Sequence, residues 1–127
     1  MGDRMNPSDI HGKRLIAVAG KDTFGKQFIN VVNKEIAPLG LMMIGININE
    51  EDFGFFIHNL ADSKVEVTIF MPEYQKEAAR FFGLDGVLLM SYKEDDELRF
   101  VTASEVTPID DRKLLDLTKE LGVSDEI

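Results

Sequence analysis

The chain has no cysteine, which excludes disulfide bonds and thiol catalysis. The absence also fits a reducing compartment, so we expect a cytoplasmic protein. Histidine is almost as scarce. His11 and His58 are the two in the sequence, and they lie too far apart to give the ligand spacing of a metal site. We therefore expect no metal centre.

Positive charge is in short supply as well. The chain has 14 Lys and Arg residues against 23 Asp and Glu residues, a formal net charge of -9. This excess of acid disfavours nucleic acids and anionic membranes as partners. Long apolar runs are also lacking, since none approaches the ~20 residues that a membrane span requires. The N-terminus reads neither as a signal peptide nor as a myristoylation site, because Asn6 stands where Ser or Thr is needed.

The remaining composition is that of one folded domain. Hydrophobic residues make up 44% of the 127 residues, enough for a core. Residues 1–12 are polar and contain Pro7 and Gly12, so we expect a flexible arm there. We expect a single α/β domain over 13–122 and a short tail at 123–127.

Short apolar stretches alternate with stretches of helical periodicity along the chain. The expected strands are 15–19, 42–48, 65–71, 86–92 and 98–101. The acidic turn "KEDDE" joins the last two in a hairpin. Asn49 and Pro72 each open a helix, and Thr107 caps the last one, which Gly122 ends. The helical positions expected to face the core are Phe28, Val31, Val32, Ile36, Leu39, Phe53, Phe56, Ile57, Leu60, Tyr74, Ala78, Phe81 and Phe82.

The resulting order is β-α-β-α-β-α-β-β-α. Alternating strands and helices of this kind form parallel sheets with right-handed crossovers. The sequence therefore predicts a three-layer α/β sandwich with a mostly parallel sheet and a C-terminal β-hairpin.

The stretch "VAGKDTFGKQF" has the spacing of a phosphate-binding P-loop, with Gly20, Gly25 and Lys26 after an apolar strand. A P-loop also needs a hydroxyl for Mg²⁺, and Gln27 stands in its place. No acidic metal partner ends another apolar strand. A glycine-containing turn between strand and helix explains the spacing better than an ATP or GTP site. Binding of some other anion at the helix N-terminus, helped by Lys21 and Lys26, stays open.

Residues 15–104 resemble the N-terminal, substrate-binding domain of shikimate dehydrogenase. The resemblance rests on motif order and spacing. The stretch from Gly20 to "PLGL" matches the first loop and helix of that domain without a gap. "NLADSKVEVTIFMP" is similar to the stretch through Asn-Val-Thr-Ile-Pro, and "LDGVLLMSYKEDDELRFVTAS" to the stretch from Gly-Ala-Val-Asn-Thr to Asn-Thr-Asp. The resemblance implies the same fold and a cleft for a small carboxylate.

The residues that would carry the family's activity are replaced. The two serines that bind the substrate carboxylate fall on Lys26 and Phe28, and the Asn of Asn-Val-Thr falls on Glu66. The catalytic Lys falls on Pro72 without a gap, or on Tyr74 with a two-residue insertion.

Other parts of the enzyme are missing as well. The catalytic Asp falls near Ala103, and the second motif Asn falls near Leu88 or Leu89. No G-x-G-x-x-G for a nicotinamide cofactor occurs in the sequence. The resemblance therefore implies a domain without shikimate dehydrogenase activity and without a bound cofactor.

Our leading interpretation is a small-ligand-binding or protein-interaction domain, with a homodimer if two of the phenylalanines are exposed. Two alternatives stay open: a small enzyme with different chemistry in the same cleft, and a nucleotide-binding protein that uses the Gly20–Lys26 loop. If a ligand binds, we expect a small anion at the C-terminal edge of the parallel strands. The candidate ligand-binding residues are Lys21, Lys26, Glu66, Thr68 and Tyr74. The last four each have an alternative structural explanation as a surface or core residue.

Overall fold

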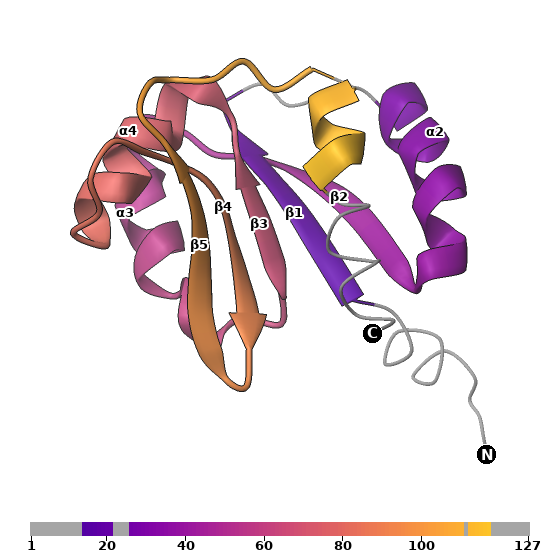
Figure 1. Cartoon of the computed structure of the whole chain (residues 1–127), viewed down its shortest axis with the longest axis horizontal. Coiled ribbons are helices and arrows are strands. Elements are labelled where there is room, and N and C mark those ends of the chain that lie inside the picture. The colour runs from indigo at the N-terminus through magenta and orange to yellow at the C-terminus, as the bar shows by residue number, and fades with distance from the viewer. Residues whose placement is uncertain (1–13, 22–25, 111, 118–127) are drawn as a thin grey trace.

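The computed structural model describes residues 14–21, 26–110 and 112–117 (Figure 1). The expected arm and tail lie outside these ranges, and so do residues 22–25 of the Gly20–Lys26 loop. For residues 26–28 only the backbone is described. The elements are β1 (Arg14–Gly20), α2 (Lys26–Ile36), η1 (Ala37–Leu39), β2 (Leu41–Asn47), α3 (Glu50–His58), η2 (Leu60–Asp62), β3 (Val67–Phe70), α4 (Pro72–Phe81), β4 (Val87–Glu94) and β5 (Glu97–Ala103); residues 112–117 form a further helical turn.

The five strands form one sheet in the order β2-β1-β3-β4-β5. β1 pairs in parallel with both β2 and β3, whereas β4 pairs antiparallel with β3 and with β5. The parallel part of the sheet is therefore β2-β1-β3, and the β4–β5 hairpin extends it. Asp95 and Asp96 both have positive φ, 54° and 67°, as a two-residue hairpin turn requires. The predicted fold class and hairpin are confirmed.

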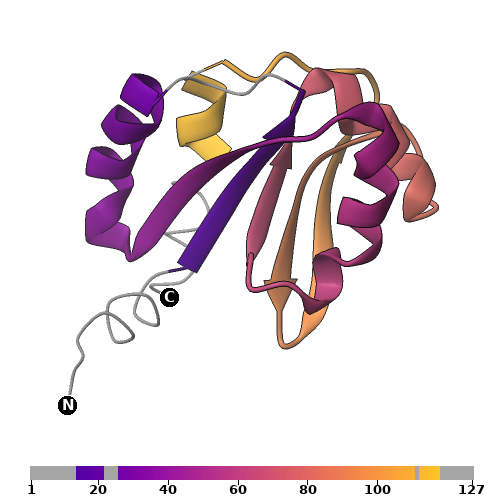
Figure 2. The ribbon, with the colours of Figure 1, turned by 180° about the vertical axis from the view of Figure 1, so that it is seen from behind.

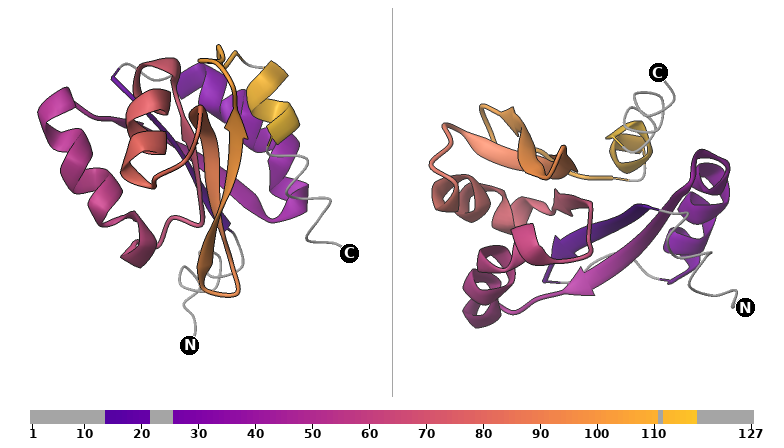
Figure 3. Two further views of the ribbon diagram at one scale, coloured as in Figure 1. Left: turned by 60° about the vertical axis from the view of Figure 1, so that its left-hand side comes forward. Right: turned by 90° about the horizontal axis from the view of Figure 1, so that it is seen from below.

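Helices cover both faces of the sheet (Figures 2 and 3). α2 and the helical residues 112–117 lie on one face, and α3 and α4 lie on the other. Two hydrophobic clusters fill the spaces between the layers. β1 is buried on both faces, from Ile16 to Ala19, which explains its uninterrupted apolar sequence. The first cluster includes Ile16, Val18, Val32, Ile36, Leu41, Met43, Val67, Ile69, Met90 and Leu114; the second includes Ala19, Phe53, Ile57, Leu60, Phe70, Tyr74, Ala78 and Leu88.

The outer edge of β2 is partly covered by a side chain from α2. The Asn33 amide nitrogen donates a hydrogen bond to the Met43 carbonyl oxygen (3.1 Å), and the Met43 N–H donates to Asn33 Oδ1 (2.7 Å). This pair of bonds replaces those that a neighbouring strand would make. It therefore blocks the middle of an edge strand, which would otherwise be open to pairing with another chain.

Three expectations about the elements are wrong in detail. Val31 and Phe81 are 59% and 47% exposed, because the buried side of each helix is narrower than the apolar sequence suggests. β3 covers four residues rather than seven. Thr107 does not begin the last helix. Asp110 occupies the capping position, since its carboxylate accepts a hydrogen bond from the Lys113 N–H at 2.9 Å. The expected end at Gly122 lies outside the described residues.

Thr107 cannot begin a helix because Gln75 holds its backbone. The Thr107 N–H donates to Gln75 Oε1, and Gln75 Nε2 donates to the Thr107 carbonyl oxygen, each at 2.8 Å. Gln75 Nε2 also donates to the Phe70 carbonyl oxygen at 3.0 Å. Gln75 is fully buried. Its carboxamide thus fixes the segment that follows β5 as that segment crosses the edge of the sheet to reach the opposite face (Figure 1).

We predict that Gln75→Leu lowers the free energy of unfolding by about 2–4 kcal/mol, because it leaves buried backbone groups without partners. Leu and Gln have similar helix propensities, so α4 itself should be little affected. Denaturant unfolding measures the change. Glu77→Leu, the same new side chain at an exposed position two residues away, should change stability by less than about 0.5 kcal/mol. Equal effects of the two substitutions would contradict the role of Gln75.

Candidate functional site

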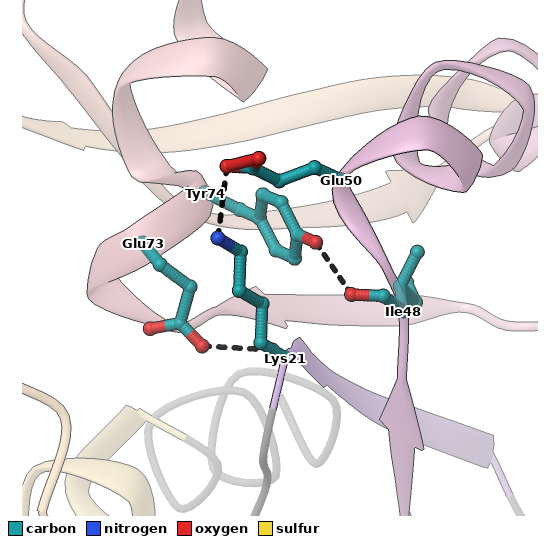
Figure 4. A network of polar contacts seen from close by, with 5 residues as sticks. All are labelled: Lys21, Ile48, Glu50, Glu73 and Tyr74. Carbon is teal, nitrogen blue, oxygen red and sulfur yellow. Dashed lines mark hydrogen bonds and ion pairs between the residues drawn. The ribbon is translucent and has the colours of Figure 1, made fainter.

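The three parallel strands end at a common edge of the sheet. β1 ends at Gly20, β2 at Asn47 and β3 at Phe70, and α3 and α4 begin just beyond β2 and β3. The N-termini of helices have free N–H groups and the positive end of the helix dipole. This edge is therefore where the fold presents polar groups (Figure 4).

Lys21 lies at the centre of a polar network at this edge. Its Nζ donates a hydrogen bond to Glu50 Oε2 at 2.8 Å and forms an ion pair with that carboxylate. Its backbone N–H donates to Glu73 Oε2, also at 2.8 Å. The Lys21 and Glu50 side chains are 46% and 71% exposed. Two carboxylates from the starts of α3 and α4 thus bind to one residue that follows β1.

Gly20 is a requirement of this arrangement. A Cβ at Gly20 would lie 2.6 Å from Met71 Cγ and 2.8 Å from Glu73 Oε2. Any larger residue would push the Glu73 carboxylate away from the Lys21 N–H. The glycine of the P-loop-like spacing thus serves the close approach of β1 to the start of α4.

Tyr74 lies beneath the network and is fully buried. Its hydroxyl donates a hydrogen bond to the Ile48 carbonyl oxygen at 2.5 Å. Its ring stacks on that of Phe53, with centroids 4.1 Å apart and planes 7° apart. Burial raises the pKa of the Tyr74 phenol, and the nearby ammonium of Lys21 acts in the opposite direction. Tyr74 is therefore a neutral hydrogen-bond donor that joins α4 to the segment between β2 and α3.

The Lys21–Glu50 pair shifts the titration of both groups. The hydrogen bond and the charge of Glu50 raise the pKa of Lys21 above 10.5, and the hydrogen bond and charge of Lys21 lower the pKa of Glu50 below 4.5. Both side chains are therefore charged at neutral pH. The contact brings two negative charges against one positive charge, so any added anion must compete with carboxylates already present.

The other predicted site residues do not all reach this edge. Glu66 precedes β3 at the opposite edge of the sheet, where its Oε1 lies 3.2 Å from Arg14 Nε. Thr68 is buried within β3, opposite Ser91 of β4. Lys26 begins α2, but its side chain lies outside the described atoms. The structure therefore brings Lys21 and Tyr74 together and separates both from Glu66.

Glu50 and Glu73 take part in the network but are absent from the predicted site. The sequence does mark Glu50 as a first-turn carboxylate of α3. Its contact with Lys21 joins residues 29 apart, and the Glu73 contact joins residues 52 apart. No spacing along the chain signals such pairs.

The described residues contain neither a group of three or more His, Asp or Glu side chains able to hold a metal ion nor a helix long and apolar enough to cross a bilayer. The edge of β1–β3 offers hydrogen-bond donors for carboxylates: an ammonium group and a backbone N–H. These groups define the protein as a three-layer α/β domain with a polar site at the carboxyl ends of its parallel strands.

The fold is similar to that of several solved structures. No family model and no curated protein sequence matches the chain, but solved structures do. Shikimate dehydrogenase 1 from Peptoclostridium difficile matches with a TM-score of 0.56 and 10% identity, over 68% of this chain and 36% of that one. Shikimate 5-dehydrogenase from Listeria monocytogenes, solved with shikimate and NAD, matches with a TM-score of 0.56 and 9% identity, over 77% of this chain and 36% of that one. Ligand-free 5-ketofructose reductase of a Gluconobacter strain matches with a TM-score of 0.52 and 9% identity, over 68% of this chain and 34% of that one.

The chain spans about a third of the length of these proteins. At 9–10% identity the likeness concerns the fold alone. The resemblance to the substrate-binding domain of shikimate dehydrogenase is therefore confirmed for the fold.

We predict that Lys21→Met raises the pKa of Glu50 toward its ordinary value, since the hydrogen bond and ion pair are lost. Because the folded-state pKa of Glu50 is lowered, the contribution of the pair to stability is present above the unfolded-state pKa and is lost as the pH falls through the folded-state value. For Lys21 the pH dependence is the reverse, because its folded-state pKa is raised above 10.5. Its contribution to stability is present at lower pH and is lost as the pH rises through that folded-state pKa. NMR titration of the Glu50 carboxyl carbon measures the shift. Lys34→Met, the same substitution on an exposed face of α2, should leave the Glu50 titration as in the wild type; a shift there too would mean a general charge effect.

Proposed function

We propose that this chain is a small-ligand-binding domain with the fold of the shikimate dehydrogenase substrate-binding domain and without that enzyme's activity. Its ligand is a small carboxylate, bound at the edge where β1, β2 and β3 end. A single observation carries the proposal: Lys21 already binds two carboxylates there, one through its ammonium group and one through its backbone N–H.

The exposure of the Lys21–Glu50 pair supports exchange with a ligand. An exposed ion pair contributes little to stability, typically ~0–1 kcal/mol. Glu50 can therefore leave Lys21 at small cost when an external carboxylate arrives. Glu73 is held differently, because its partner is a backbone N–H at a close approach of two elements. We therefore propose that the ligand carboxylate replaces Glu50, and not Glu73, as the partner of Lys21. Lys26, at the start of α2, would be a second cation for the ligand.

The buried residues beneath the edge support a binding role rather than proton transfer. Tyr74 stands at one of the two positions that align with the family's catalytic Lys, and its hydroxyl is already engaged by the Ile48 carbonyl oxygen. Its raised pKa makes it a poor base at neutral pH. Ala103, near the position of the catalytic Asp, has no acid or base group.

We predict that the purified chain does not oxidise shikimate with NAD or NADP, because no acid–base pair occupies the positions of the family's Lys and Asp. Cofactor reduction followed by absorbance tests this, with a shikimate dehydrogenase assayed under the same conditions as the positive control. Reduction that depends on shikimate would overturn the assignment and favour the alternative of an enzyme acting in the same cleft.

We predict opposite effects of two substitutions on carboxylate binding. Glu50→Gln removes the internal competitor and should tighten binding, whereas Lys21→Met removes the cation and should abolish it. Each variant loses the same ion pair, so a stability change alone affects both in the same direction. Thermal shift and calorimetric titration with a panel of small carboxylates that includes shikimate and succinate would measure the two effects.

The result that would contradict this site is a carboxylate that binds both variants equally well. Lys26→Glu is a further variant, in which a negative charge at the start of α2 should weaken binding. A ligand that binds the wild type and responds only to Lys26→Glu would place the site in the Gly20–Lys26 loop, as in the nucleotide-binding alternative.

An interaction role has one observation in its favour. Phe55 is 78% exposed on α3. It borders a largely apolar groove of about 330 Å³, whose lining includes Ile48, Phe56 and Leu60. An exposed aromatic beside an apolar hollow is typical of protein–protein contacts, including homodimers. The oligomeric state in solution distinguishes this role from ligand binding.

A further inference from the structure

A second hollow lies beside α4 and contains no residue of the Lys21 network. It has a volume of about 390 Å³ and lies between α4, the start of β4 and the end of β5. None of its lining residues takes part in the network at the edge of the parallel strands. The lining residues are Lys76, Arg80, Leu84, Gly86, Val87 and Ser104.

Two cations of this hollow have no ion-pair partner among the described residues. Lys76 and Arg80 lie one helical turn apart on α4 and therefore project from the same side of the helix. Within the part of the chain that the structure describes, neither side chain makes a hydrogen bond or an ion pair. Lys21 and Arg99, by contrast, are each paired with a carboxylate.

The backbone holds this hollow in shape. Gly86 has φ 75°, and a Cβ there would lie 2.2 Å from the Ala103 carbonyl oxygen. Only glycine therefore permits this approach of β4 to the end of β5. The approach places Ser104, directly after β5, beside the two cations. Three residues that carry an ammonium, a guanidinium and a hydroxyl group thus line one hollow.

These groups match the chemistry of a phosphomonoester. A phosphate dianion carries about two negative charges and several acceptor oxygens. A guanidinium binds two of those oxygens through parallel N–H groups, and an ammonium neutralises a further charge. Leu84 and Val87 offer an apolar wall for the carbon part of the ligand. A carboxylate, with one charge, would use only part of this donor set.

We propose that the hollow between α4 and the ends of β4 and β5 binds the phosphate group of a small phosphorylated molecule through Lys76, Arg80 and Ser104. This site is separate from the carboxylate site of the proposed function, so either can fail without the other.

The test is an NMR titration of the full chain with inorganic phosphate and with phenyl phosphate, at constant ionic strength set with sodium chloride. The Gly86 and Ser104 amide signals should move and saturate, and phenyl phosphate should bind more tightly because of the apolar wall. The variant with Lys76→Gln and Arg80→Gln should lose at least about tenfold in affinity, as expected when two charge-assisted contacts are removed. The variant with Lys34→Gln and Lys64→Gln has the same net charge, and both replaced side chains are exposed elsewhere; it should bind as the wild type does.

Three outcomes would overturn the proposal. One is the absence of a saturable response of Gly86 and Ser104 in the wild type. Another is equal weakening in the two double variants, which would mean non-specific attraction by net charge. The third is acetate binding as tightly as phosphate at these amides, which would mean that the site does not select a dianion. Titration of Lys21→Met should give wild-type phosphate binding and so keeps the two sites distinguishable.

Discussion

The carboxamide of Gln75 makes the connection on which the arrangement of the layers depends. The segment after β5 must leave the α4 side of the sheet and cross to the α2 side, where Ile109 and Leu114 enter the first hydrophobic cluster. No strand pairing fixes this crossing. Gln75 fixes it through two hydrogen bonds to the backbone of Thr107 and one to the carbonyl of Phe70. Because Gln75 is fully buried, a lost bond would leave polar groups away from water. The side chain of Asn33 likewise binds backbone groups, those of Met43 at the outer edge of β2.

α4 carries several roles on different sides of the helix, and this follows from its 100° turn per residue. Glu73 faces the Lys21 N–H at the edge of the parallel strands, Tyr74 faces Phe53 in the second cluster, and Gln75 faces the crossing segment. Lys76 and Arg80 line the hollow beside the ends of β4 and β5. The Gln75 hydrogen bonds, the Lys21 network and the hollow lined by Lys76 and Arg80 thus share one rigid element. A shift of α4 would disturb all three, so the buried contacts of Tyr74 and Gln75 also position the groups that face solvent.

Much of the fold could be predicted from the sequence, because strand and helix periodicities are local. The apolar stretch 15–19 forms most of β1 and is buried from Ile16 to Ala19, and Pro72 begins α4, as its fixed φ favours. The errors arise where tertiary contacts override local signals. Thr107 was expected to cap the last helix, but Gln75 holds it in a segment without regular secondary structure, and the described helical residues are 112–117. Val31 continues an apolar pattern but lies on the solvent side of α2.

The site was less predictable than the fold because its contacts join distant residues. Lys21 could be placed at the end of a strand, and Glu50 at the start of a helix, but their pairing depends on the order of strands in the sheet. β1 lies between β2 and β3, so the residues that follow all three strands meet at one edge. Glu66 was placed with Lys21 because it aligns with a family motif, although it precedes its strand and so lies at the opposite edge.

The two candidate sites differ in whether their cations already form an ion pair within the protein, and this difference matters more than the net charge of the chain. The ammonium of Lys21 is engaged by Glu50, so a carboxylate that binds there must exchange with a group of the protein, and its affinity is reduced by the stability of that pair. Lys76 and Arg80 have no such partner in the described residues, so no ion pair of the protein has to break when an anion binds there. At physiological salt, charges more than ~8 Å apart are largely screened. The excess of acid elsewhere on the chain therefore weakens binding at either site only modestly. The groups in direct contact with an anion therefore decide its binding: at the end of β1 a cation that is already paired, and beside α4 two cations that have no ion-pair partner among the described residues.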